Sequence, residues 1–360
     1  MGAARTHRVA VLPGDGIGVE TTREAVGVLE ALASRGDVRL SFTDLPWSAE
    51  RFLATGEAVP RGALEALGRE QDAVLAGAFG DPRVPDMRHA EAILLGLRRT
   101  LDLYANVRPV RCLDDRLCPL KGRKAEEVDL VVVRENTEGA YSGLGGRFRA
   151  GTPEEIAIEE DLTTRRGVTR VVKFAFELAR TLPRPARLGR PPRVTLADKH
   201  NAQRFGGALW HEVFRELARE FPDCEAAHLY ADTLAHALVR DPSPFDVVVT
   251  NNLLGDILSD LAAALSGGLG LAPSANVHPG RTSLFEPVHG SAPDLAGRGL
   301  ANPFGSILSA ALMLRHLGEP GAAGRVEAAV ADCVRSGKTT PDLGGKLTTA
   351  EAGSAVRARL

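Results

Sequence analysis

The segment at residues 245–261, FDVVVTNNLLGDILSDL, constrains the fold of this chain more than any other. A short apolar run rich in β-branched residues stops at a polar turn and a helix follows, which predicts one strand–loop–helix unit. Open α/β sheets bind their ligands at the carboxyl ends of such strands. Asp256 and Asp260 are four residues apart and so share one helical face. Two oxygen ligands on one face suit Mg²⁺ or Mn²⁺, although such a pair alone is more often an ordinary acidic surface.

Composition narrows the class of protein. A chain of 360 residues predicts two domains or one large α/β unit, and 44% hydrophobic with 25% charged residues is typical of a soluble globular protein. The net charge of -2 argues against nucleic-acid and anionic-membrane partners and leaves small acidic substrates. The four cysteines show neither disulfide nor zinc spacing, and no signal peptide or membrane span is evident. We therefore expect a cytoplasmic protein.

Strands alternating with helices predict a largely parallel sheet. The apolar runs expected as strands are residues 8–12, 72–76 and 128–133, with a helix over 20–33. Residues 143–153 predict an extended arm or loop, and the proline-rich residues 183–192 a non-helical surface connection. The glycine loop at residues 14–18 has GxGxG rather than GxGxxG spacing, so a Rossmann dinucleotide fold is not predicted.

Six segments together carry a family resemblance: VLPGDGIG (11–18), YANVRPV (104–110), VVVRENTEGAYSG (131–143), ADKHNA (197–202), NNLLGDILSD (251–260) and LFEPVHGSAPDLAGRGLANP (284–303). The chain resembles the β-decarboxylating dehydrogenases, which include isopropylmalate, isocitrate, homoisocitrate, tartrate and D-malate dehydrogenases. The resemblance implies the isopropylmalate/isocitrate dehydrogenase-like fold, with two α/β domains and a central cleft. It implies a discontinuous cofactor-binding domain at 1–103 plus 267–360. The second domain, 104–266, would hold the dimer interface, the arm and the metal-binding aspartates.

These enzymes oxidise the C2 hydroxyl of a malate-like acid, and the resulting β-keto acid loses its C3 carboxylate as CO₂. By resemblance, Asp256 and Asp260 bind the metal and Asp232 of the partner subunit supplies a third ligand, which implies a homodimer with shared active sites. An isolated aspartate such as Asp232 more often caps a helix. Lys199 corresponds to the general base and Tyr141 to the general acid.

The predicted substrate contacts include three arginines that resemble the family's carboxylate clamp: Arg98, Arg108 and Arg134. Glu91, Leu94 and Leu95 share one helical face with Arg98 and resemble the residues that meet the isopropyl group in isopropylmalate dehydrogenases. Burying three substrate carbons against the leucines would favour an alkylmalate by roughly 2.4 kcal/mol. We therefore predict oxidation of 3-isopropylmalate to 2-oxo-4-methylpentanoate, a step of leucine biosynthesis.

Other members stay open as alternatives. RENTEG at residues 134–139 resembles the isocitrate, homoisocitrate and tartrate branches, while residues 80–82 and 145–155 resemble tartrate-type enzymes. The alternatives are thus a tartrate, D-malate, homoisocitrate or isocitrate dehydrogenase, or a 3-alkylmalate dehydrogenase of a specialised pathway. A non-catalytic regulatory paralogue is disfavoured, because such subunits typically lose the metal or base residues that are kept here.

The predicted cofactor is NAD. Asp294 corresponds to the family's marker for NAD, since its carboxylate would bind the ribose hydroxyls, whereas NADP enzymes have a lysine followed by tyrosine. Leu295 stands in place of that tyrosine. The remaining residues that the resemblance assigns to the cofactor are Glu286, His289, Gly290, Ser291, Ala292 and Asn302.

Overall fold

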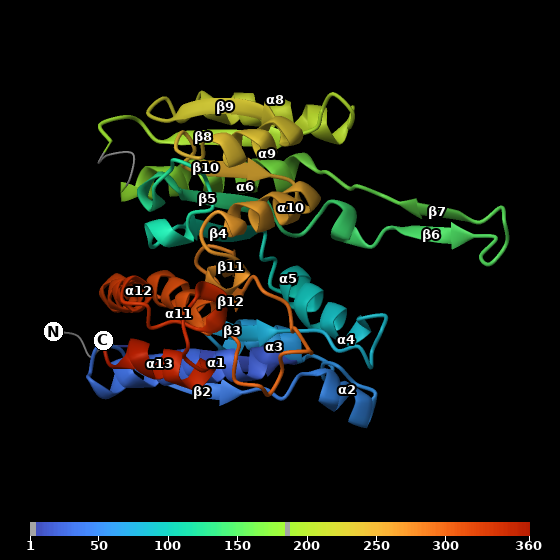
Figure 1. Cartoon of the computed structure of the whole chain (residues 1–360). Helices are drawn as coiled ribbons and strands as arrows, with labels where there is room; N and C mark the ends of the chain where they lie inside the picture. Colours follow the sequence, from blue (N-terminus) through green and yellow to red (C-terminus); the bar gives the residue numbers. More distant parts are fainter. Residues whose placement is uncertain (1–4, 184–187) are drawn as a thin grey trace. The chain divides into compact units, whose positions relative to one another are not determined.

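The computed structural model describes residues 5–183 and 188–360 and divides into two compact units (Figure 1). The first comprises residues 5–103, Arg111–Glu126 and Ala263–Leu360; the second comprises Tyr104–Val110 and Glu127–Ala262. We expected residues 111–126 and 263–266 in the second domain, whereas the structure groups them with the first unit. Within the first unit, Arg116 donates a hydrogen bond to the Val334 carbonyl and Leu117 packs beside Gly267, which fixes the segment there.

The first unit contains sheet strands in the order β2-β1-β3-β12-β11. β1, β3 and β12 pair in parallel and are mostly buried, as expected of apolar strands covered on both faces, while β11 runs antiparallel to β12. The strands are β1 (His7–Gly14), β2 (Leu40–Asp44), β3 (Ala73–Ala78), β11 (Pro273–Val277) and β12 (Ser283–Pro287). The longer helices are α1 (Ile17–Ser34), α2 (Ala49–Thr55), α3 (Ala63–Glu70), α11 (Phe304–His316), α12 (Pro320–Arg335) and α13 (Thr349–Arg357).

The glycine loop after β1 has a structural role. Asp15 is buried, and its carboxylate accepts hydrogen bonds from the backbone N–H groups of Ala49 at 2.7 Å and Gly80 at 2.9 Å. The ring nitrogen Nε2 of His89 lies 3.0 Å from the same carboxylate. The Asp15 side chain thus contacts three other segments of the first unit. This structural role explains an aspartate in the glycine loop without the need for a bound nucleotide phosphate.

The second unit contains strands in the order β4-β5-β10-β8-β9. β10 pairs in parallel with β5 and β8, and β8 with β9. The strands are β4 (Ala105–Arg111), β5 (Asp129–Glu135), β8 (Arg193–Asp198), β9 (Glu225–Tyr230) and β10 (Val247–Thr250), and the helices are α6 (Arg165–Thr181), α8 (Gly206–Ala218), α9 (Ala231–Arg240) and α10 (Asn252–Ala264). Asn251 ends the turn after β10 and accepts the N–H of Leu254, which caps α10. The predicted strand–loop–helix unit is therefore confirmed.

The expected arm forms an antiparallel hairpin of β6 (Gly145–Phe148) and β7 (Ile156–Glu159), which extends away from the rest of the second unit (Figure 1). All eight strand residues are exposed. Of the expected connection at 183–192, residues 184–187 lie outside the described residues. No helix in the described part of the chain is long and apolar enough to cross a membrane.

Candidate active site

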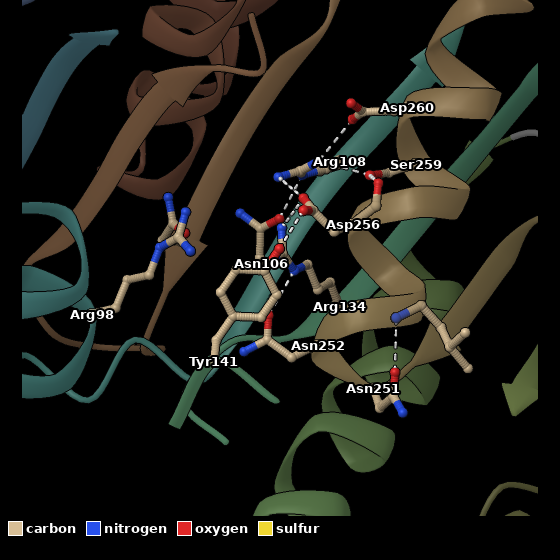
Figure 2. Close-up of polar contacts among 12 residues, drawn as sticks. Arg98, Asn106, Arg108, Arg134, Tyr141, Asn251, Asn252, Asp256, Ser259 and Asp260 are labelled. Carbon is tan, nitrogen blue, oxygen red and sulfur yellow. Dashed lines mark hydrogen bonds and ion pairs between the residues drawn. The ribbon is translucent and has the colours of Figure 1, made fainter. Parts of the chain in front are cut away.

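The two aspartates of α10 lie beside two arginines from neighbouring strands (Figure 2). Arg108, on β4, places one guanidinium nitrogen 3.3 Å from Asp256 Oδ1 and another 3.2 Å from Asp260 Oδ1. Arg134, on β5, forms a second ion pair with Asp256 Oδ1. The side chains of Asp256 and Asp260 keep 36% and 52% exposure, so both carboxylates remain open to a ligand.

Tyr141 completes this group from the 3₁₀ turn η4 (Ala140–Ser142). Its hydroxyl donates to Asp256 Oδ2 at 2.7 Å, and the Arg134 guanidinium carbon lies 5.0 Å from the ring centre. Burial, with a further contribution from Asp256, raises the pKa of Tyr141 above its usual value. The phenol therefore stays protonated at neutral pH, which is the form that a general acid needs.

Both arginines are held by residues that the sequence-based assignment of roles did not include. Asn106 Oδ1 accepts from Arg108 Nε at 2.8 Å, and Arg108 Nη1 lies 2.7 Å from Ser259 Oγ. Arg134 is 2% exposed and donates from Nε to Asn252 Oδ1 at 2.9 Å. Asn106 lies two residues before Arg108 on one strand, so the alternation of side chains in a strand could have identified it.

Lys199 and Asp232 pair with each other at the surface of the second unit. Lys199 Nζ lies 2.8 Å from Asp232 Oδ1, and the two side chains are 32% and 68% exposed. The hydrogen bond from Lys199 lowers the pKa of Asp232. Asp232 lies in the first turn of α9 and, within the described ranges, does not join Asp256 and Asp260 in a group close enough to share a metal ion.

The donors on α10 fit a divalent cation with oxygen ligands. Burial raises the pKa of Asp260, Asp256 adds to this effect, and Arg108 opposes it. A bound cation would offset the repulsion between the two carboxylates, as Arg108 does in this structure.

In the first unit, the predicted substrate helix contains a π turn. It consists of α4 (Arg88–Ala90), η1 (Glu91–Leu95, a π-helical turn) and α5 (Gly96–Thr100). The regular i, i+3, i+4, i+7 spacing that we expected is therefore interrupted, because a π turn closes i→i+5 hydrogen bonds. Leu94 packs against the buried core that contains Ile93 and Leu97, whereas Leu95 is half-buried and Glu91 is exposed.

Arg98 lies on α5, in the same helix, and is buried against a predicted cofactor residue. Its Nη2 lies 3.2 Å from Glu286 Oε1, which also accepts from Asn276 Nδ2 at 2.9 Å. Glu286 thus holds Arg98 in place within the first unit.

The loop after β12 contains the other predicted cofactor residues. His289 is buried; its Nδ1 lies 3.0 Å from the Gly290 carbonyl, while Nε2 has no hydrogen-bond partner among the described residues. Burial lowers the pKa of His289, so its ring is neutral at pH 7. Ala292 adopts a positive φ of 37°, and Asp294 is exposed. The unpartnered ring nitrogen of His289 and the exposed carboxylate of Asp294, both in this loop, fit a ligand that offers hydroxyl and amide groups.

Two further contacts fix the shape of this loop. Ile17 N–H donates to the Ser291 carbonyl at 2.8 Å, and a Cβ at Gly16 would lie only 2.0 Å from that oxygen, so the close approach requires glycine. Asn302 donates to Asp342 Oδ2 at 2.9 Å.

A family model described as isocitrate/isopropylmalate dehydrogenase matches residues 8–356. The chain belongs to this family. It is 47% identical to a 3-isopropylmalate dehydrogenase of Thermobifida fusca over 92% of each chain, and 46% identical to one of Rhodococcus jostii over 98% of this chain and 100% of that protein. The crystal structure of an isocitrate dehydrogenase from Methylococcus capsulatus superposes with a TM-score of 0.86 at 38% identity, covering 98% and 99% of the two chains. The predicted α/β fold and family are therefore confirmed.

Within this dehydrogenase family member, the second unit brings together four of the predicted site residues directly: Arg108, Arg134, Tyr141 and Asp256. Asp260 joins them through Arg108, whereas Lys199 and Asp232 form a separate pair.

Proposed function

We propose that this protein catalyses the NAD-dependent oxidative decarboxylation of 3-isopropylmalate to 2-oxo-4-methylpentanoate and CO₂, a step of leucine biosynthesis. The observation that carries the proposal is the arrangement of Arg108, Arg134 and Tyr141 around Asp256. Relatives at 46–47% identity named 3-isopropylmalate dehydrogenase support the choice of substrate.

Asp256 and Asp260 would hold Mg²⁺ or Mn²⁺, which when bound polarises the C2 oxygen of the substrate. The two buried guanidinium groups lie against these carboxylates and partly offset their negative charge. Each guanidinium has five N–H donors, so Arg108 and Arg134 can also bind substrate carboxylates. Arg98 is proposed as the third member of this carboxylate clamp.

Tyr141 would give its proton to C3 after CO₂ has left, because its hydroxyl remains protonated and is oriented by Asp256. Lys199 would accept the proton of the C2 hydroxyl during oxidation. Lys199 and Asp232 are exposed and paired at 2.8 Å, so one subunit can present both to the Asp256 site of a second. The proposed active unit is therefore a homodimer with two shared sites.

The C3 substituent is proposed to contact Leu95. Leu94 is partly buried and packs against the core, so it would contribute mainly by holding the π turn in place. Isocitrate would place a charged carboxylate against these leucines, and an unpaired charge in apolar surroundings is costly.

NAD is proposed as the cofactor and would accept the hydride lost from C2. His289 Nε2 and the exposed Asp294 carboxylate are the groups proposed to meet it, together with the backbone of Gly290, Ser291 and Ala292. Asn302 would add an amide at the adjacent turn.

The test is NADH formation with Mn²⁺ over a panel of malates that differ at C3: 3-isopropylmalate, isocitrate, homoisocitrate, tartrate and D-malate. We expect the highest kcat/KM for 3-isopropylmalate. The alkyl group contributes about 2.4 kcal/mol, or roughly 60-fold over D-malate, and Leu95→Ser should reduce this ratio. Exposed Leu53, on α2, offers a matched control as Leu53→Ser. Turnover of isocitrate or tartrate at least tenfold more efficient than that of 3-isopropylmalate would overturn the assignment.

A further inference from the structure

Three histidines and an aspartate, none of them a predicted site residue, meet in the second unit. Asp198 ends β8, His200 follows it, His211 lies on α8 and His228 on β9. One candidate ligand atom of each residue lies within 4.8 Å of the others. The three imidazole rings are neighbours, with centres 4.7 to 5.1 Å apart.

The sheet register explains this meeting. β8 and β9 pair in parallel, with Leu196 opposite His228 and Asp198 opposite Tyr230. The Asp198 carboxylate can thus reach along the sheet, and its Oδ1 lies 2.9 Å from His228 Nε2 and 3.0 Å from His200 Nδ1. One nearly buried carboxylate therefore already orients two imidazoles.

His211 is the unpaired member of the group. Its Nδ1 is buried, with no hydrogen-bond partner in residues 5–183 and 188–360. Burial lowers the pKa of His211, and the adjacent His228 and His200 add to this effect. A neutral imidazole with an unused nitrogen is a metal ligand without further change.

We propose that Asp198, His200, His211 and His228 bind a divalent transition-metal ion, with Zn²⁺ as the best match. Three imidazole nitrogens and one carboxylate form a four-ligand zinc set, whereas Mg²⁺ prefers oxygen ligands. Zinc–ligand bonds of about 2.0–2.1 Å place tetrahedral ligand atoms roughly 3.4 Å apart. The group lies within 4.8 Å before any ion binds, so modest side-chain rotations would close it.

The second unit offers an entry path to the proposed zinc site, and it places Lys199 next to that site in the sequence. A surface hollow of about 350 Å³ is lined by His211, Phe214 and His228, among others, and offers an entry path. Lys199 stands between two of the ligands, Asp198 and His200. Zinc would therefore fix the backbone on both sides of Lys199, as a structural ion separate from the proposed Mg²⁺ or Mn²⁺ site.

Zinc binding is tested on the full-length, chelator-treated protein by calorimetric titration with Zn²⁺ in excess Mg²⁺, which is added to fill the proposed cation site at the α10 aspartates. We expect one Zn²⁺ per chain, and tetrahedral Co²⁺ absorption when Co²⁺ replaces it. His211→Ala and His228→Ala should each weaken zinc binding at least about tenfold. His236→Ala, at an exposed histidine of the same unit, should bind zinc like the wild type.

The proposal is overturned if the wild type binds no zinc in excess Mg²⁺, or if both ligand variants bind it as tightly as the wild type. If circular dichroism shows that His211→Ala is unfolded, His200→Ala takes its place, since the His200 side chain is 28% exposed. Asp256→Asn separates this inference from the proposed function: it should abolish NADH formation and leave zinc binding unchanged.

Discussion

Gly255→Ala should damage the enzyme although alanine normally favours a helix. In an exposed helix interior, replacing glycine by alanine stabilises by about 1 kcal/mol. At Gly255, on α10, the new Cβ would lie 2.6 Å from Arg134 Cγ and 2.7 Å from Arg134 Cβ. Overpacking of this kind costs about 1–3 kcal/mol, which cancels or exceeds the helix gain.

The larger effect should fall on catalysis. Arg134 is 2% exposed, so it cannot move into solvent without leaving Asn252 and Asp256. Loss of one hydrogen bond to a charged group costs about 1.5–3 kcal/mol, which corresponds to a roughly 10- to 150-fold lower kcat/KM. The measurements are kcat/KM for 3-isopropylmalate with NAD and Mn²⁺, and the free energy of unfolding in urea.

Gly324→Ala is the matched control. Gly324 lies in α12, and a Cβ there would meet nothing within 4 Å, so this variant should gain stability and keep its activity. The reasoning is refuted if Gly255→Ala gains stability as Gly324→Ala does and keeps kcat/KM within about threefold of the wild type.

Four further outcomes follow from the site. Lys199→Met, folded and dimeric, should retain less than a tenth of wild-type kcat. Tyr141→Phe should still oxidise the substrate but slow the protonation of C3 after CO₂ loss. This is measured by comparing the release of the enol or enolate product with NADH formation. Asp294 should repel the 2'-phosphate of NADP by roughly 3 kcal/mol, about a hundredfold, so replacing Asp294 by Lys and Leu295 by Tyr should narrow the ratio of kcat/KM for NAD and NADP; equal values in the wild type would contradict this role. Burial lowers the pKa of His289, so as pH falls below about 6.5 the unfolded state takes up this proton before the folded state does. The free energy of unfolding should therefore decrease at acidic pH. Urea titrations at pH 7 and pH 5 should show a smaller decrease for His289→Asn than for the wild type.

Local pattern alone determined the main elements and one half of the site. The apolar runs at residues 72–76 and 128–133 became the buried strands β3 and β5, since burial on both faces requires apolar side chains throughout. The spacing of Asp256 and Asp260 placed both on one helical face, which the shared contact with Arg108 confirms.

The same local reasoning failed where tertiary packing decides the backbone. The residues from Glu91 to Arg98 carry a helical pattern, yet a π turn replaces the regular helix while Ile93 and Leu97 remain fully buried. Residues 111–126 belong with the first unit because of contacts to Val334 and Gly267, more than 140 residues away in sequence.

Contacts between segments that are distant in the sequence could not be predicted from the sequence, for a physical reason. Periodicity reports which face of one element is apolar, whereas the distance between two side chains depends on the order and register of the strands that carry them. Arg134 reaches Asp256 because β5 pairs with β10, and Asp198 reaches His228 because β8 pairs with β9. The sequence by itself determined the family and the chemical types of the site residues; only the tertiary structure decided which charges neutralise each other and which histidines meet.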